Sequence, residues 1–217
     1  IQFKHAMLAN SNADEFARQE FVKSFKLHLA SRISPGNKAI YDTRVVPEIK
    51  AETGKEPEDR HQIRKKMERQ LPYQFWSSLQ RTSQEMMWKS VQISVERQWA
   101  DLLESANNSS SEYSTLELNP DLEIPKYHRC VDIHCQPGGY HTEQTKDDVA
   151  AGAIYDRAVY IYAMGRMGPF NDDIGASTAI YLKATYPDFK PRRILDLGCT
   201  VGHSTIPYVD TYPEAEV

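Results

Sequence analysis

The chain has few cysteines and no long apolar run. It carries three cysteines in 217 residues: Cys130, Cys135 and Cys199. Three widely spaced cysteines do not form a disulfide framework, so we expect a reducing, cytoplasmic environment. No apolar stretch approaches the roughly 18 residues that a membrane-spanning helix needs, and the first residues lack the pattern of a secretory signal. We therefore expect no membrane partner.

The chain also lacks an excess of positive charge. It has 26 Lys and Arg against 30 Asp and Glu, for a formal net charge of −4. Surfaces that bind nucleic acid are usually basic, so this balance argues against a nucleic-acid partner. One basic cluster, at Arg64, Lys65 and Lys66, fits a solvated helix face. With 40% hydrophobic and 26% charged residues, the chain is expected to fold.

The first half of the chain shows helical patterns. Asn12 precedes acidic residues, which predicts a capped helix over about 13–31. Turn-forming residues at 34–37 predict a turn. A second helix is predicted at about 38–53, ended by Gly54.

The clearest amphipathic pattern runs from about residue 73 to 105. Apolar residues recur there at steps of three and four: Trp88, Val91, Val95, Trp99 and Leu102. This spacing predicts a long helix whose aromatic side chains belong to a core rather than to a ligand site. The polar run at 107–111 then predicts a flexible linker.

The second half is predicted to be irregular at first and then ordered. We expect a helix at about 146–165, and a second one that is capped by Asn171 and ends before Pro187. An apolar strand is predicted at 193–197 and a helix at about 202–212. The run of apolar residues in the strand is typical of a parallel strand buried on both faces of a sheet.

A glycine loop joins this last strand to the last helix. Gly198 permits a tight turn, and Gly202 leaves room for a ligand against the backbone. The loop has no lysine after Gly202, so it is not a phosphate P-loop. The third glycine of a dinucleotide fingerprint is also missing, which disfavours a nicotinamide oxidoreductase. Asp196, two residues before Gly198, suits a cationic group such as the α-amino group of an amino-acid-like ligand.

Residues 194–202, Ile-Leu-Asp-Leu-Gly-Cys-Thr-Val-Gly, resemble motif I of class I S-adenosylmethionine-dependent methyltransferases, Asp-x-Gly-x-Gly-x-Gly. Thr200 stands where that motif usually has its middle glycine. The resemblance implies that S-adenosylmethionine is the cofactor. It implies the following cofactor-binding residues in the loop: Asp196, Gly198, Cys199, Thr200 and Gly202.

The polar run at 107–111 and the resemblance together predict a domain organisation. We expect an N-terminal helical region at 1–106, a linker and irregular loop region at 107–145, a helical lid at 146–190, and a Rossmann-like cofactor-binding domain that starts at 191–217. The fold class is thus mostly α, leading into the first strand and helix of an α/β sheet. Because later strands hold the ribose and adenine in this family, we expect an N-terminal portion that is inactive alone.

Helices before the first strand often reach the methionine end of the cofactor in this family. Tyr155 and Arg157, in the helix predicted at 146–165, are therefore candidate cofactor contacts. The alternative is that Tyr155 is a core residue, because it lies at helical spacing from Val159 and Tyr162.

The segment at 132–143 contains further candidate residues. His134 or His141 could act as a general base for the methyl acceptor, oriented by Glu143, because imidazole titrates near neutral pH. The alternative is a structural loop. A zinc site with Cys130 and Cys135 is disfavoured by the missing Cys-x-x-Cys pair, so we expect no metal.

The leading hypothesis is methyl transfer from S-adenosylmethionine to a small-molecule acceptor. The rival hypothesis is a helical interaction module with a non-catalytic α/β remnant. In either case, the N-terminal helices offer a surface for self-association.

Overall fold

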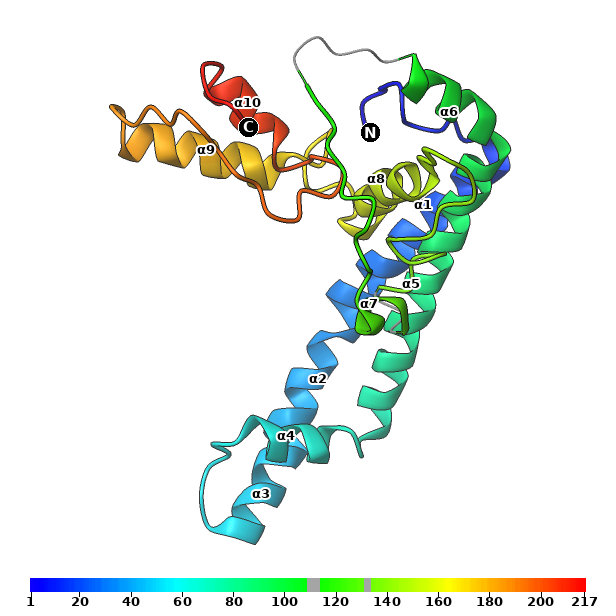
Figure 1. Cartoon of the computed structure of the whole chain (residues 1–217). Helices are drawn as coiled ribbons and strands as arrows, with labels where there is room; N and C mark the ends of the chain where they lie inside the picture. Colours follow the sequence, from blue (N-terminus) through cyan, green and yellow to red (C-terminus); the bar gives the residue numbers. More distant parts are fainter. Residues whose placement is uncertain (109–113, 131–133) are drawn as a thin grey trace.

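The computed structural model describes residues 1–108, 114–130 and 134–217, and the fold is mostly helical (Figure 1). Helices account for 58% of the chain, and the described residues form no sheet. The helices are α1 (Ala13–His28), α2 (Pro35–Ile40), α3 (Val46–Thr53), α4 (Arg60–Met67), α5 (Leu71–Arg97), α6 (Trp99–Asn107), α7 (Lys126–Cys130), α8 (Ala150–Tyr162), α9 (Asp173–Thr185) and α10 (Ile206–Thr211), with π-helical turns at Leu29–Ile33 and Tyr41–Val45. No helix among the described residues is long and apolar enough to cross a membrane.

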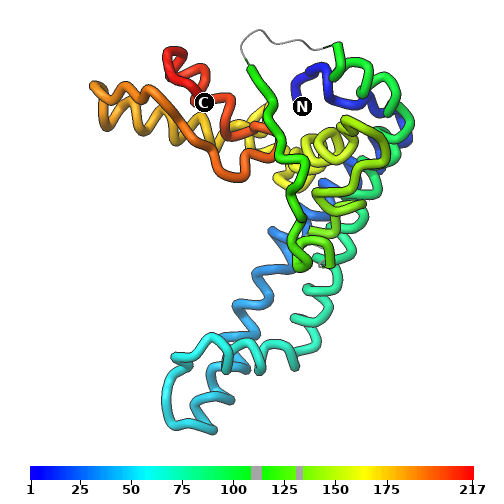
Figure 2. Tube along the Cα trace, in the orientation of Figure 1, coloured from blue at the N-terminus to red at the C-terminus, as the bar shows by residue number. Residues whose placement is uncertain are grey.

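Helices α1, α2 and α3 follow one another along an arm (Figure 2), and α1 and α2 run beside α5. The predicted cap is confirmed: the Asn12 side chain accepts a hydrogen bond from the Glu15 N–H, and the Glu15 carboxylate accepts one from the Asn12 N–H, both at 2.9 Å. Gly54 ends α3 with φ 74°, also as predicted. The turn predicted at 34–37 is wrong. Ser34 keeps helical angles and Pro35 begins α2, where its missing N–H costs little.

The long amphipathic pattern forms two helices rather than one. Helix α5 ends at Arg97, and Gln98 leaves the helical region with φ −118° and ψ 18° before α6 begins. The Gln98 side-chain amide donates to the carbonyls of Ser94 and Asn10, at 2.9 and 2.8 Å. These bonds satisfy acceptors at the break, so the chain changes direction without unpaired polar groups there.

The main core lies where α8 packs against α1 and α5. Its fully buried side chains come from all three helices: Val22, Val91, Val95, Ala158 and Ile161. Helix α8, the first part of the lid expected at 146–190, therefore shares a core with the N-terminal helices. A second, smaller cluster of Val45, Ile49 and Met67 holds the far end of the arm, where α3 meets α4.

Helices α9 and α10 pack together and project away from the arm (Figure 1). The predicted cap at Asn171 is wrong, because Asp172 takes the N-cap position of α9. Asn171 instead adopts φ 56°, is buried, and donates from Nδ2 to the Asp156 carbonyl at 3.1 Å. Helix α10 is shorter than the predicted 202–212, since residues 198–205 form the loop that precedes it.

The apolar segment at 193–197 is not the buried strand that its sequence predicts. One parallel bridge joins Arg193 to Glu216, with the Ile194 N–H donating to the Glu216 carbonyl at 2.8 Å. Leu195 and Leu197 are 80% and 85% exposed. A strand buries its side chains only when neighbouring strands and covering helices supply a surface, and the described residues supply none here.

Candidate functional site

The glycine loop places three residues in the left-handed region of backbone space. These are Gly198 with φ 81°, Thr200 with φ 54° and Gly202 with φ 83°. A non-glycine residue at positive φ is strained by about 1–3 kcal/mol, and such residues cluster at functional sites. Thr200 thus adopts the backbone conformation that a glycine favours, at the position where the methyltransferase motif has its middle glycine.

Two glycines let this loop lie directly against the helices on either side. A side chain at Gly175 of α9 would place its Cβ 2.4 Å from the Ser204 carbonyl oxygen. A Cβ at Gly152 of α8 would lie 3.4 Å from a Val201 methyl group. The backbone of the loop is therefore seated on α9, and Val201 packs against α8.

This seating gives a first prediction. Gly175→Ala will lower the free energy of unfolding by about 1–3 kcal/mol, because the new methyl group overlaps the Ser204 backbone. Gly36→Ala, in α2 with open space around it, is the matched control and will be neutral or stabilising by up to about 1 kcal/mol. Urea denaturation of both variants measures the difference. Equal effects at the two glycines would contradict the close seating.

Asp196 and the loop amides offer hydrogen-bonding groups that the described residues leave open. The Thr205 hydroxyl donates to Asp196 Oδ2 at 2.5 Å, and Oδ1 accepts no hydrogen bond from the described part of the chain. Within the same limits, the N–H groups of residues 198–201 donate to no protein acceptor. Cys199 is exposed in the same loop. One carboxylate oxygen and a run of N–H groups can thus meet the amino and carboxylate groups of an amino acid.

Asp156 of α8, which sequence reasoning missed, holds the loop to two other parts of the chain. His203 Nε2 donates to its Oδ1 at 2.6 Å, while Gln2 Nε2 and His5 Nε2 donate to its Oδ2 at 2.7 and 3.1 Å. Asp156 is only 7% exposed. A buried carboxylate needs such donors, and here they join the N-terminal segment, α8 and the glycine loop. In the sequence, the only feature that could have indicated this contact is the position of His203 directly after Gly202.

Tyr155, the first candidate cofactor contact, lies beside the glycine loop. Its ring stacks on the His203 ring, with centroids 6.2 Å apart and 25° between planes. Tyr140 meets Tyr155 edge-on at 6.0 Å, and Trp88 lies on it at 6.5 Å. Tyr155 therefore both packs against the core and contacts the loop.

Arg157 does not reach the loop. Its Nε donates to Gln19 at 2.8 Å and its Nη1 donates to Gln2 at 3.1 Å, while its guanidinium lies 5.2 Å from the centroid of the Tyr160 ring. Burial lowers the pKa of Arg157. Residues two apart in a helix point to different sides, so Tyr155 and Arg157 cannot both face the loop.

His134 is held in a strained conformation near this ring cluster. It has φ 57°, and its carbonyl accepts hydrogen bonds from Gln84 Nε2, at 3.2 Å, and from Trp88 Nε1. Its Nδ1 is joined to the Tyr140 hydroxyl by a 2.6 Å hydrogen bond. Burial is the main cause that raises the pKa of Tyr140 to about 12, and the neighbouring Tyr155 adds a smaller effect in the same direction. Tyr140 thus stays protonated and connects His134 to Tyr155.

His141 lies further from the loop along the same cluster of rings. Its ring is 5.7 Å from that of His128, which in turn is 6.4 Å from Tyr140. Glu143 is exposed. Within the described residues, no group of three or more His, Cys, Asp or Glu side chains is placed to hold a metal ion.

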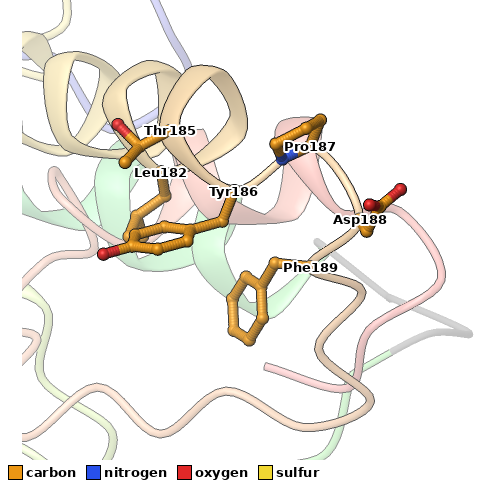
Figure 3. Close-up of a pocket in the computed structure, with 6 residues that line it drawn as sticks. All are labelled: Leu182, Thr185, Tyr186, Pro187, Asp188 and Phe189. Atoms are coloured by element: carbon orange, nitrogen blue, oxygen red, sulfur yellow. The ribbon is translucent and has the colours of Figure 1, made fainter.

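A separate hollow of about 600 Å³ lies at the end of α9, roughly 15 Å along the helix axis from Gly175 (Figure 3). Its lining is largely apolar: Leu182, Thr185, Tyr186, Pro187, Asp188 and Phe189. Figure 3 shows the Asp188 carboxylate pointing away from the Tyr186 and Phe189 rings. The hollow therefore offers mainly apolar surface, and the only carboxylate in its lining points away from the two rings.

No protein-family model, no curated protein and no solved structure matches this chain. The residues of the loop and the geometry around them are therefore the basis for a functional proposal.

Proposed function

We propose that the chain binds S-adenosylmethionine at its glycine loop and takes part in methyl transfer to a small-molecule acceptor, in the manner of class I methyltransferases. The observation that carries this proposal is the left-handed backbone at residues 198, 200 and 202. These are the three glycine positions of the methyltransferase motif, and the chain keeps that conformation even at Thr200. Threonine is β-branched, so it adopts a positive φ only where its surroundings hold it there.

The groups around the loop fit the amino-acid end of this cofactor. Asp196 would accept a hydrogen bond from the amino group through the oxygen that Thr205 does not use. The N–H groups of residues 198–201 would donate to the carboxylate. Tyr155 would line the loop on the side of α8. S-adenosylmethionine supplies a methyl group already activated on sulfur, so the protein has to align the acceptor and exclude water.

His134 is the residue proposed to accept a proton from the methyl acceptor. When its Nδ1–H donates to the Tyr140 oxygen, Nε2 carries the lone pair that a base requires. Tyr140 would then be a positioning residue, since it fixes the ring without touching the acceptor. We assign the second candidate base, His141, no such role, because its ring contact is to His128 rather than to the Tyr140–Tyr155 pair.

Calorimetric titration tests the cofactor proposal, and it predicts a specific effect of Asp196. The full chain will bind S-adenosylmethionine, and Asp196→Ala will weaken the affinity about tenfold or more, the usual cost of a lost charge-assisted hydrogen bond. Thr205→Val is the matched control, because it removes the hydrogen bond to Asp196 but keeps the carboxylate. It will change the affinity by less than about threefold.

Two results would count against the proposal. The first is no binding heat for the full chain at millimolar ligand. The second is binding that is equally strong in Asp196→Ala, since the ligand would then lie elsewhere. Stable self-association with no cofactor binding would favour the rival hypothesis of an interaction module.

A further inference from the structure

An apolar groove of about 460 Å³ lies between α1 and α5. Its apolar lining includes Ala17, Phe21, Met86 and Ile93, and Phe21 is 59% exposed. Aromatic and aliphatic side chains exposed together on one face are typical of a protein interface. The two helices that form it lie side by side along the arm (Figure 1).

The charged side chains that line this groove are both cationic. Arg18 lies on α1 and Lys89 on α5. Neither makes an ion pair with any residue in the described ranges, whereas Lys23 and Arg81, on the same helices, each pair with a nearby acid. An apolar groove with two unpaired cations is complementary to a segment that is both apolar and acidic.

This chain contains such a segment at residues 116–123, which we call the acidic leucine segment. Its leucines point into solvent: Leu116, Leu118 and Leu122 are 84%, 72% and 69% exposed. Its acids, Glu117, Asp121 and Glu123, are exposed and make no ion pair within the described residues. Three exposed leucines in eight residues are unfavourable unless another surface covers them.

The acidic leucine segment does not cover the groove of its own copy. It leads down into α7 (Figure 1), and beyond α7 the His134 carbonyl lies against α5, where it accepts hydrogen bonds from Gln84 and Trp88. At 100° per residue, Met86, Lys89 and Ile93 lie on the opposite side of α5 from Gln84 and Trp88. A second copy is therefore needed to bring the segment to the groove.

We propose that the acidic leucine segment of one copy docks in the α1–α5 groove of a second copy. The leucines cover Phe21 and Ile93, and the acids lie along the rim within reach of Arg18 and Lys89. Each copy has both surfaces, so the contact can be made twice about a two-fold axis and closes as a dimer. This inference does not depend on the methyltransferase proposal.

Sedimentation velocity of the full chain over a range of protein concentrations tests for the dimer, and charge-reversal variants test how it forms. The unchanged chain will show a dimer that dissociates on dilution. Arg18→Glu with Lys89→Glu will weaken the dimer about tenfold or more, and so will Glu117→Lys with Glu123→Lys. Combining all four changes will restore the affinity to within about threefold, because the charges are then exchanged across the interface.

A matched control is Arg60→Glu with Lys65→Glu, which reverses two exposed cations on α4 without touching the groove. It will leave the dimer unchanged, and circular dichroism will confirm that all variants keep their helices. A chain that stays monomeric at every concentration would overturn the proposal. A dimer that both pairs of reversals leave intact would also overturn it. So would a variant with all four changes whose dimer affinity stays as weak as that of either pair alone.

Discussion

Replacing Asp156 with alanine will lower the free energy of unfolding by about 3 kcal/mol or more. Asp156 is buried and accepts hydrogen bonds from Gln2, His5 and His203. Alanine leaves these three donors without their acceptor. Gln2 and His203 are 4% and 13% exposed, and each unpaired buried group costs about 1–3 kcal/mol, whereas His5 is 31% exposed and can turn to water. Urea denaturation, followed by circular dichroism, measures the loss.

The position of Asp156 gives the same variant a second, local effect. Because the carboxylate joins the glycine loop to the N-terminal segment, we expect both to loosen when it is removed. Asp210→Ala, at an exposed site on α10, is the matched control and will change stability by less than about 0.5 kcal/mol. An Asp156→Ala variant as stable as this control would show that the buried carboxylate does not hold these parts together.

Replacing Glu15 will produce the second large effect, at the start of α1. Glu15 is 3% exposed and receives hydrogen bonds from Arg97, at 2.9 and 2.8 Å, and from Ser94, at 3.0 Å. It also closes the capping box with Asn12. Glu15→Ala removes all of these contacts and will destabilise the chain by about 2 kcal/mol or more.

The stabilisation by Glu15 will depend on pH. The pKa of Glu15 is lowered from 4.5 to about 2, mainly by its hydrogen bonds from Arg97. Burial acts in the opposite direction, and hydrogen bonds from Asn12 and Ser94 lower the pKa further. A carboxyl group with a lowered folded-state pKa stabilises fully above its unfolded pKa and loses that stabilisation as the pH falls through the folded one. The advantage of the unchanged chain over Glu15→Gln will therefore shrink between pH 4.5 and about 2.

Denaturation of both chains across this pH range checks the sign of the effect. Glu85→Gln is the control, since Glu85 forms an exposed pair with Arg81 on one helix. It will change stability by less than about 0.5 kcal/mol at any pH. A difference between the unchanged chain and Glu15→Gln that stays constant as the pH falls would contradict the role of the charged carboxylate.

The features that could be predicted from the sequence are those set by neighbouring residues. Asn12 and Glu15 make their capping box within one helical turn, and Gly54 ends α3 through its own backbone freedom. The helical periodicity over 73–105 likewise depends on residues three and four apart, although it did not predict the break at Gln98. That break depends on Asn10, which is 88 residues away in the chain.

The candidate site could be predicted only in part, for the same reason. The loop positions Asp196, Gly198 and Gly202 form one short pattern, and Tyr155 lies beside them. Asp156 could not be identified, because its donors come from residues 151 to 154 positions before it and 47 after it. The buried strand was predicted from the composition of residues 193–197, but burial depends on what surrounds a segment, and the described chain leaves Leu195 and Leu197 exposed.

The most direct measurement of the cofactor proposal is a nitrogen-15 NMR titration of the full chain with S-adenosylmethionine. The account predicts that the largest shifts of backbone amide signals fall on Gly198, Cys199, Thr200 and Val201, whose N–H groups have no protein acceptor among the described residues. It also predicts that Asp196→Ala reduces these shifts at the same ligand concentration. Unchanged loop signals at millimolar ligand, or shifts confined to other parts of the chain, would contradict the account.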